Sequence, residues 1–206
     1  MNNIPNALTE RYNYQTNTNI WIRKDAAEFG YTDGEQTEKY IKDSTVNSQD
    51  LSVGSEELMH KIRDWPSRYH FSPSRVNILR PIQPHLKGNI LEIGSGCGAI
   101  TRYLGECDAQ VLALEGSPNR ATITAARCRD LDNVTVLNDN FADLDIDIKF
   151  DVITFIGVLE YSRMFIDAPD PIAFSLEKCF SLLAPNGKLV VAIENQLGLK
   201  YFAGAY

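Results

Sequence analysis

The hydrophobic positions of this chain fall into short apolar runs that are separated by longer amphipathic stretches. The runs predict buried strands at residues 90–93, 110–115, 133–137, 150–156 and 188–193. Helix starts lie between them, as at Ser117 with Pro118 and at Asp170 with Pro171. Strands that alternate with helices predict an α/β fold with a parallel sheet.

A glycine-rich turn follows the first of these strands. Gly94, Gly96 and Gly98, with Ser95 between them, let the backbone turn tightly and approach a ligand closely. The next helix repeats apolar residues at helical spacing, from Ile100 to Cys107. A strand, a glycine turn and a helix start within residues 89–104 predict a nucleotide-type cofactor site.

Two cofactors compete for this turn. Gly94, Gly96 and Ala99 satisfy the dinucleotide pattern G-x-G-x-x-G/A, in which the helix N-terminus receives a pyrophosphate. Glu92 with the glycines gives E-x-G-x-G, the first motif of methyltransferases that use S-adenosylmethionine (SAM). The turn alone leaves both possibilities open.

The ends of the later strands carry polar residues suited to a nucleoside. Glu115 closes the second strand 21 residues after Gly94, where a carboxylate grips a ribose diol. The third strand delivers Asp139 and Asn140 to the same edge of the sheet. The fourth strand leads into a loop at residues 157–161, and the turn APNG precedes the fifth strand.

In order, spacing and residue type, residues 65–193 resemble the class I SAM-dependent methyltransferases. The resemblance implies a Rossmann-like three-layer sandwich with the strand order 3-2-1-4-5, SAM as cofactor and S-adenosylhomocysteine (SAH) as product. It assigns Glu92 to the methionine end of SAM, Glu115 to the ribose and Asp139 to the adenine amino group. The cofactor residues that it implies are Glu92, Gly94, Ser95, Gly96, Gly98, Glu115, Gly116, Ser117, Asp139, Asn140, Phe141, Ile156 and Gly157.

The end of the chain departs from this pattern. The family has seven strands, whereas this chain ends about thirteen residues after the fifth. We therefore expect a sheet truncated before its last two strands, a natural sequence that continues, and an exposed edge at the fifth strand. A partner or a second copy of the chain would cover that edge, which makes a homo-oligomer an expectation.

Two flanking segments resemble a narrower group. Residues 63–81 and 193–206 look like methyltransferases of bacterial surface-polysaccharide, or O-antigen, biosynthesis, which are often fused to glycosyltransferase domains. This resemblance implies a sugar or glycan-lipid acceptor.

The loop after the fourth strand bears on the acceptor atom. It reads FIGVLEY, without the Asn/Asp-Pro-Pro-Tyr/Phe sequence that accompanies methylation of adenine or glutamine nitrogen. Arginine methyltransferases carry two glutamates on the corresponding hairpin loop, whereas only Glu160 occurs here. Because Ile156 and Gly157 stand where metal-dependent enzymes have an aspartate, we expect metal-free O-methylation. Glu160 and His70 are the candidate bases, and Tyr161 is a candidate acceptor contact.

Composition limits the class of protein and the kinds of partner that the sequence allows. No apolar run approaches eighteen residues and the N-terminus lacks an apolar leader, which predicts a soluble, cytoplasmic protein without a membrane span. Four cysteines without C-x-x-C spacing predict buried thiols and no metal site. A net charge of −7 disfavours nucleic acid, which binds through Lys and Arg.

The first fifty residues form a distinct polar segment, with six asparagines among the first nineteen positions. We expect it to be partly mobile or to form a lid, with short helices at residues 26–29 and 35–41. Residues 51–206 are then the SAM-binding domain, with helices at 55–63 and from Ser72 toward Pro81. Three functions stay open: a methyltransferase, an oxidoreductase with a nicotinamide cofactor, and a SAM-binding module without turnover.

Overall fold

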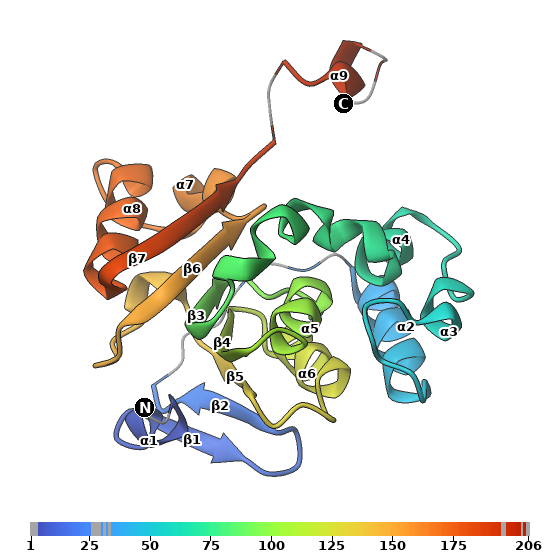
Figure 1. Ribbon diagram of the computed structural model, residues 1–206, viewed down its shortest axis with the longest axis horizontal. Coiled ribbons are helices and arrows are strands. Elements are labelled where there is room, and N and C mark those ends of the chain that lie inside the picture. The colour runs from blue at the N-terminus through green and yellow to red at the C-terminus, as the bar shows by residue number, and fades with distance from the viewer. Residues whose placement is uncertain are drawn as a thin grey trace.

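The computed structural model describes residues 4–25, 30, 32, 34–194, 197–202 and 204. They form a Rossmann-like α/β fold around a seven-stranded, mostly parallel sheet of order β1-β2-β5-β4-β3-β6-β7 (Figure 1). The strands are β1 (Tyr12–Gln15), β2 (Ile20–Arg23), β3 (Gly88–Ile93), β4 (Ala109–Glu115), β5 (Val134–Asn138), β6 (Phe150–Ile156) and β7 (Leu183–Ala192).

Helices cover both faces of the sheet because the central strands are apolar on both sides. On one face, Leu91 and Ile93 of β3 pack into a cluster with α1 (Ile4–Leu8) and α8 (Pro171–Leu182). On the other face, Ile90 packs against α5 (Ala99–Gly105). Alanines 121 and 125 of α6 (Pro118–Arg127) contact that face beside α5.

The N-terminal hairpin corrects the expected strand order 3-2-1-4-5. The five expected strands lie in the order β5-β4-β3-β6-β7, but β2 adds to β5 in parallel and β1 pairs with β2 in antiparallel orientation. Buried Ile20 pairs with Val136, and Asn19 in the turn takes a positive φ of 55°. Only Tyr12 of β1 and Ile20 of β2 are fully buried, so their apolar pattern was too short to predict strands.

The first fifty residues thus share the core of the protein. Ile4, Leu8 and Tyr12 belong to the same buried cluster as the strands β3 to β6. The helix expected at residues 35–41 is present and extends further, as α2 (Glu35–Val46), which lies against α6. The helix expected at residues 26–29 lies outside the described residues.

Two helices expected before the sheet are shorter or of another type. Ser55 caps a helix as predicted, but this helix, α3 (Glu56–Met59), has a single turn, and α4 (Trp65–Phe71) begins after it. The stretch after Ser72 forms the 3₁₀ helices η1 (Pro73–Ile78) and η2 (Arg80–His85). Pro81 and Pro84 lack the N–H that a continuous α-helix needs, which explains this correction.

β7 is the edge strand of the described sheet and pairs with β6 through residues up to Ala192. It includes the expected APNG turn, where Asn186 has a positive φ of 66° and the register with β6 shifts. The remaining elements are η3 (Phe141–Asp143), η4 (Leu159–Tyr161), α7 (Ser162–Phe165) and α9 (Leu199–Phe202). Within the described part of the chain, the search for a helix long and apolar enough to cross a membrane finds none.

Candidate functional site

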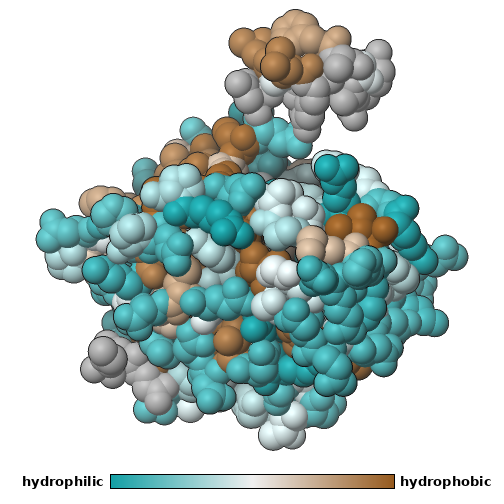
Figure 2. Space-filling model, turned by 45° about the vertical axis from the view of Figure 1, so that its right-hand side comes forward, coloured by the Kyte–Doolittle hydropathy of each residue, from teal (hydrophilic) through white to brown (hydrophobic). Residues whose placement is uncertain are grey.

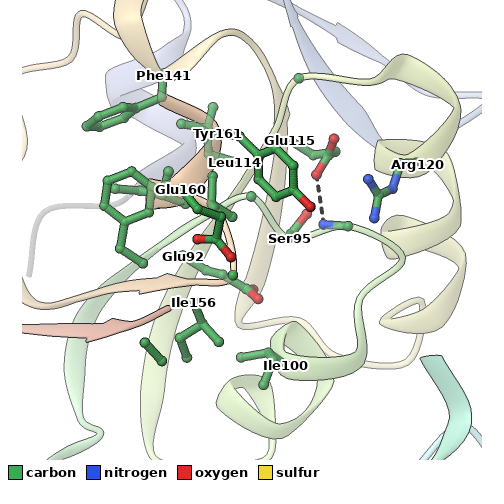
Figure 3. Close-up of a pocket in the computed structure, with 18 of the residues that line it drawn as sticks. Glu92, Ser95, Ile100, Leu114, Glu115, Arg120, Phe141, Ile156, Glu160 and Tyr161 are labelled. Carbon is green, nitrogen blue, oxygen red and sulfur yellow. Dashed lines mark hydrogen bonds between the residues drawn. The ribbon is translucent and has the colours of Figure 1, made fainter. Parts of the chain in front are cut away.

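A cavity of about 830 Å³ opens at the carboxyl ends of β3, β4, β5 and β6 (Figure 3). β3 lies between β4 and β6, where the direction of chain progression reverses, and ligands of open α/β sheets bind at this point. Among the described residues, those that line the cavity all belong to the segment 65–194. They include, of the residues expected from the sequence, His70, Glu92, Gly94, Ser95, Gly96, Glu115, Gly116, Asp139, Asn140, Phe141, Ile156, Gly157, Glu160 and Tyr161.

The glycine turn is held by the neighbouring strand. The N–H groups of Gly94 and Ser95 donate to the carbonyl oxygen of Leu114, at 2.8 and 2.9 Å. Gly94 has a φ of 74°, and a Cβ at this position would lie 2.4 Å from Cγ2 of Val158. Gly94 is therefore required both by its backbone conformation and by the close approach of the loop after β6.

Glu115 holds the other side of the turn. Its Oε2 accepts a hydrogen bond from the N–H of Gly96 at 2.7 Å, and its Oε1 accepts one from the N–H of Ser117 at 2.9 Å (Figure 3). Burial raises the pKa of Glu115, and the guanidinium of Arg120 opposes that rise. Each carboxylate oxygen keeps further acceptor capacity, as a ribose diol requires.

Glu92 is a second buried carboxylate on the floor of the cavity. Only 4% of it is exposed, and its Oε2 has no hydrogen-bond partner among the described residues. Burial raises the pKa of Glu92 to about 7, and the nearby charge of Glu115 contributes to the rise. A buried, unsatisfied carboxylate is costly unless a ligand uses it.

Asp139 is bound from the N-terminal hairpin. Arg23 donates to it twice, from Nε to Oδ1 at 2.7 Å and from Nη2 to Oδ2 at 2.8 Å. Oδ2 also accepts from the hydroxyl of Tyr12 at 2.7 Å, and Oδ1 accepts from the N–H of Asn140 at 2.8 Å. A carboxylate offers about four acceptor sites, so these four bonds use the capacity of Asp139.

The neighbouring residues continue this wall of the cavity. The side chain of Asn140 accepts from the N–H of Ala142 and so caps η3. The ring of Phe141 packs edge to face on Phe155, with centroids 5.4 Å apart. From outside, Lys178 donates to the carbonyl of Ala142 at 2.7 Å and lies 5.7 Å from the centre of the Phe141 ring.

Two expected cofactor residues do not line the cavity. Gly98 is the N-cap of α5 with a φ of 82°, and a Cβ there would lie 3.1 Å from the backbone of Thr124. Ser117 is buried and caps α6 through Arg120 N. Both shape the turn from behind the cavity.

The opposite side of the cavity carries the three expected catalytic candidates. Glu160 and Tyr161 of η4 are exposed and project into the space beside the glycine turn (Figure 3). His70 is buried on α4, and its ring stands edge to face on Tyr69 at 5.1 Å. Carboxylate and imidazole thus lie on two separate elements that border the same space.

Two cationic side chains that line the cavity, Arg120 and Arg75, were not expected from the sequence. Arg120 places Nη2 3.0 Å from the position that a Cβ on Gly96 would occupy. Arg75 lies over the ring of Tyr69, 4.0 Å from its centre, and its Nη2 donates to the Tyr69 hydroxyl. The two groups lie 3.5 and 3.6 Å from the corresponding Cβ position on Gly157, beside the carboxyl end of β6.

Metal chemistry has no visible site in the part of the chain that the structure describes. There, no three or more His, Cys, Asp or Glu side chains are grouped closely enough to hold a metal ion. The four cysteines form no disulfide; Cys97, Cys128 and Cys179 are buried, as expected, while Cys107 is half-buried.

Comparison with known proteins favours one of the two cofactor patterns. Residues 91–189 match the family model of a methyltransferase domain. This stretch has the pattern of a methyltransferase. It contains the glycine turn, Glu92, Glu115 and every strand from β4 to β6, which form part of the cavity lining.

Among curated proteins, the chain is similar to ribosomal RNA small subunit methyltransferase A of Streptococcus pneumoniae strains. The identity is 45% over 58 residues, which cover 28% of this chain and 20% of that protein. The same protein of Streptococcus gordonii is 43% identical over 58 residues. The chain thus spans about a fifth of the length of the curated relatives it matches.

Solved structures share the fold at low sequence identity. The PH0226 protein of Pyrococcus horikoshii OT3 has a TM-score of 0.56 at 15% identity, covering 84% of this chain and 67% of that one. Phosphoethanolamine N-methyltransferase 1 of Haemonchus contortus, in complex with phosphoethanolamine and SAH, has a TM-score of 0.53 at 19% identity, covering 76% of this chain and 30% of that one. A DhpI-SAM-HEP complex has a TM-score of 0.52 at 21% identity, covering 85% of this chain and 74% of that one. These likenesses show that the chain shares the fold of those proteins.

Proposed function

We propose that this chain is a SAM-dependent methyltransferase that methylates a hydroxyl group of a sugar or glycan-lipid acceptor. The observation that carries the proposal is the pair of buried carboxylates, Glu92 and Glu115, on neighbouring strands around one glycine turn. SAM combines a ribose diol with a cationic amino acid, and this pair offers an acceptor to each.

The assignment of the cofactor residues follows from their positions. Glu115 accepts hydrogen bonds from the ribose hydroxyls, and Glu92 accepts from the ammonium group of the methionine part. Phe141 and Asn140 border the adenine. Because the acceptor sites of Asp139 are taken by Arg23, Tyr12 and Asn140, we assign Asp139 to positioning this wall instead of to the adenine amino group.

The transfer itself needs little from the protein beyond alignment. The acceptor oxygen forms a bond to the methyl carbon of SAM while the carbon–sulfur bond breaks, and its electron pair goes to sulfur to give SAH. The hydroxyl proton goes to a base, for which we propose Glu160 and, as the alternative, His70. Tyr161 contacts the acceptor.

Charge and composition support a small acceptor over an RNA. The relative that acts on ribosomal RNA matches only 58 residues, and the chain has a net charge of −7. RNA binding relies on clusters of Lys and Arg. On the side of the cavity where we place the acceptor, the charged lining residues are Arg75, Glu160 and Glu194. Residues 63–81 and 193–206 resemble methyltransferases of surface-polysaccharide synthesis, which supports a glycan.

We propose that the division of the chain at residue 50 separates the residues that line the site from those that support it. The lining residues begin at Trp65, so residues 51–206 supply the site, while Arg23 and Tyr12 brace it from the hairpin. We propose that α2, whose Glu38 contacts Asn119 of α6, covers the cofactor side of this domain.

Methyl transfer from isotopically labelled SAM to simple glycosides tests the activity. We expect labelled methyl ether and SAH in equal amounts, with loss of product in Glu92→Gln and Glu115→Gln and no loss in the matched control Glu177→Gln on α8. SAM binding without product from any hydroxylated acceptor would favour the non-catalytic module. Binding of NAD in place of SAM would favour the oxidoreductase.

A further inference from the structure

Exposed apolar side chains gather at the mouth of the cavity. Trp65 is 72% exposed, Met164 70%, Ile193 57% and Ile78 47%, and all four line the cavity. We call these four residues the apolar rim. Large apolar side chains at such exposure are informative where they gather around one opening.

The rim comes from both sides of the opening. Trp65 is the first residue of α4 and Ile78 the last of η1, whereas Met164 belongs to α7 and Ile193 directly follows β7. On the face shown in Figure 2, hydrophobic residues form small areas within a mainly hydrophilic surface. Because all four rim residues also line the cavity, the apolar rim is continuous with it.

The chemistry of the cavity changes from its floor to this rim. The floor offers carboxylates and backbone groups, including Glu92 and Glu115, whereas the four rim side chains contain a single polar atom, the indole nitrogen of Trp65. A bare sugar offers such a rim only the few C–H groups of its ring faces. An aliphatic chain gains at every methylene that it buries there.

We infer that the acceptor is amphipathic: a hydroxylated head enters the cavity, and an aliphatic chain attached to it lies on the apolar rim. The adaptable thioether of Met164 and the flat indole of Trp65 suit a chain without fixed shape. This inference rests on the proposed function and selects, from its sugar and glycan-lipid acceptors, those whose head group carries an aliphatic chain.

Alkyl glycosides of increasing chain length, used below their micelle concentration, test the inference. The protein contains two tryptophans, so the variant Trp21→Phe leaves Trp65 as the sole indole reporter. We expect octyl glucoside to shift the Trp65 emission to the blue and to bind at least tenfold more tightly than ethyl glucoside. A fully buried methylene contributes about fourfold, so this expectation allows for partial burial.

Variants of the apolar rim show where the alkyl chain of the glycoside binds. Met164→Ser and Ile193→Ser should reduce the ratio of octyl to ethyl affinity at least threefold. The matched control is Phe180→Ser on α8, because Phe180 is 79% exposed but does not line the cavity. Equal affinities for the two glycosides, or an equal loss in the control, would overturn the inference.

A further outcome concerns the chain's own apolar segment. Leu199 and Phe202 of α9 are 85% and 77% exposed. If Trp65 emission is already blue without glycoside and moves to the red in Leu199→Ser/Phe202→Ser, then α9 covers the rim and the inference is wrong. SAM affinity, measured in parallel, reports on the proposed function separately, because glycoside binding can be followed without cofactor.

Discussion

Arg23 on β2 grips Asp139, the residue after β5, with two hydrogen bonds of 2.7 and 2.8 Å across a separation of 116 positions in the sequence. The side chain of Asp139 is only 3% exposed and that of Arg23 20%. The same guanidinium also donates to the carbonyl of Asp143. One cation from the N-terminal hairpin thus fixes both ends of the loop that borders the cavity.

Replacing Arg23 with Met is expected to destabilise the protein by about 2–4 kcal/mol, because Asp139 would remain buried with an uncompensated charge. Urea unfolding at pH 7 measures this loss. The matched control is Arg11→Met, which removes an ion pair to Asp145 whose side chains are 54% and 60% exposed. The control should change stability by less than about 0.5 kcal/mol.

Arg23→Met/Asp139→Asn should recover part of that loss, because an amide is less costly than an unpaired carboxylate in the same place. Equal losses in the single variant Arg23→Met and in the control Arg11→Met would contradict the bracing role of Arg23. SAM affinity should fall with the stability of the loop and recover in the double variant.

Gly94→Ala is expected to abolish cofactor binding and to lower stability by about 1–3 kcal/mol. The new Cβ would lie 2.4 Å from Val158 at a φ of 74°, a region that alanine rarely adopts. Thermal melting and calorimetry measure the two effects. Gly54→Ala serves as control, since no atom lies within 4 Å of its Cβ position. Val158→Ala should relieve the contact but leave the backbone strain.

The glycine turn and the cap of α6 could be predicted from the sequence because they depend on residues that are neighbours in the chain. The turn from Glu92 to Gly98 and the cap at Ser117 are each set by a few consecutive positions. The carboxylate Glu115 could be placed because parallel strands end at a common edge. The spacing of 21 residues from Gly94 carried that information.

The rest depends on contacts that no short pattern encodes. Tyr12 and Arg23 reach Asp139 from more than a hundred positions away, and no pattern in the sequence indicates these hydrogen bonds. The hairpin strands were missed because each has only one fully buried residue. Arg75 reaches the cavity from η1, a 3₁₀ helix that was expected as the start of an α-helix, and it donates to the hydroxyl of Tyr69 on α4.

Stability should depend on the ionisation of Glu92. Its pKa is raised to about 7 by burial, whereas a carboxyl in the unfolded chain titrates near its ordinary value. Folding therefore favours the protonated form. The contribution is fully present below about pH 4.5 and is lost as the pH rises through 7, by up to about 3 kcal/mol.

Glu92→Gln isolates this effect. The amide has nearly the same shape and no charge, so the variant should be more stable than wild type at pH 8 and similar at pH 5. Urea unfolding at both pH values gives the comparison, with Glu177→Gln as the control, because Glu177 is an exposed residue of α8. A difference between wild type and Glu92→Gln that does not change with pH would contradict the raised pKa.

Glu160→Gln is expected to reduce the turnover number about 10²- to 10⁴-fold if Glu160 accepts the hydroxyl proton, with SAM affinity unchanged. His70→Asn tests the alternative on α4. Steady-state kinetics with an acceptor that supports turnover separates the two, and the nearby exposed pair Arg163→Gln and Asp167→Asn provides controls. Near-normal turnover in both test variants would show that neither side chain is the base.

The central proposal is that the cavity binds SAM and that Glu115 holds the cofactor there. Isothermal titration of SAH, SAM and NAD into the wild-type protein, Glu115→Gln and the control Glu106→Gln measures this directly, with melting curves to verify folding. We predict binding of SAH and SAM without binding of NAD, and about a ten- to hundredfold loss of SAH affinity in Glu115→Gln alone, because charged hydrogen bonds are worth about 1.5–3 kcal/mol. An SAH affinity that is the same in wild type and in folded Glu115→Gln, or binding of NAD in preference to SAH, would contradict the account.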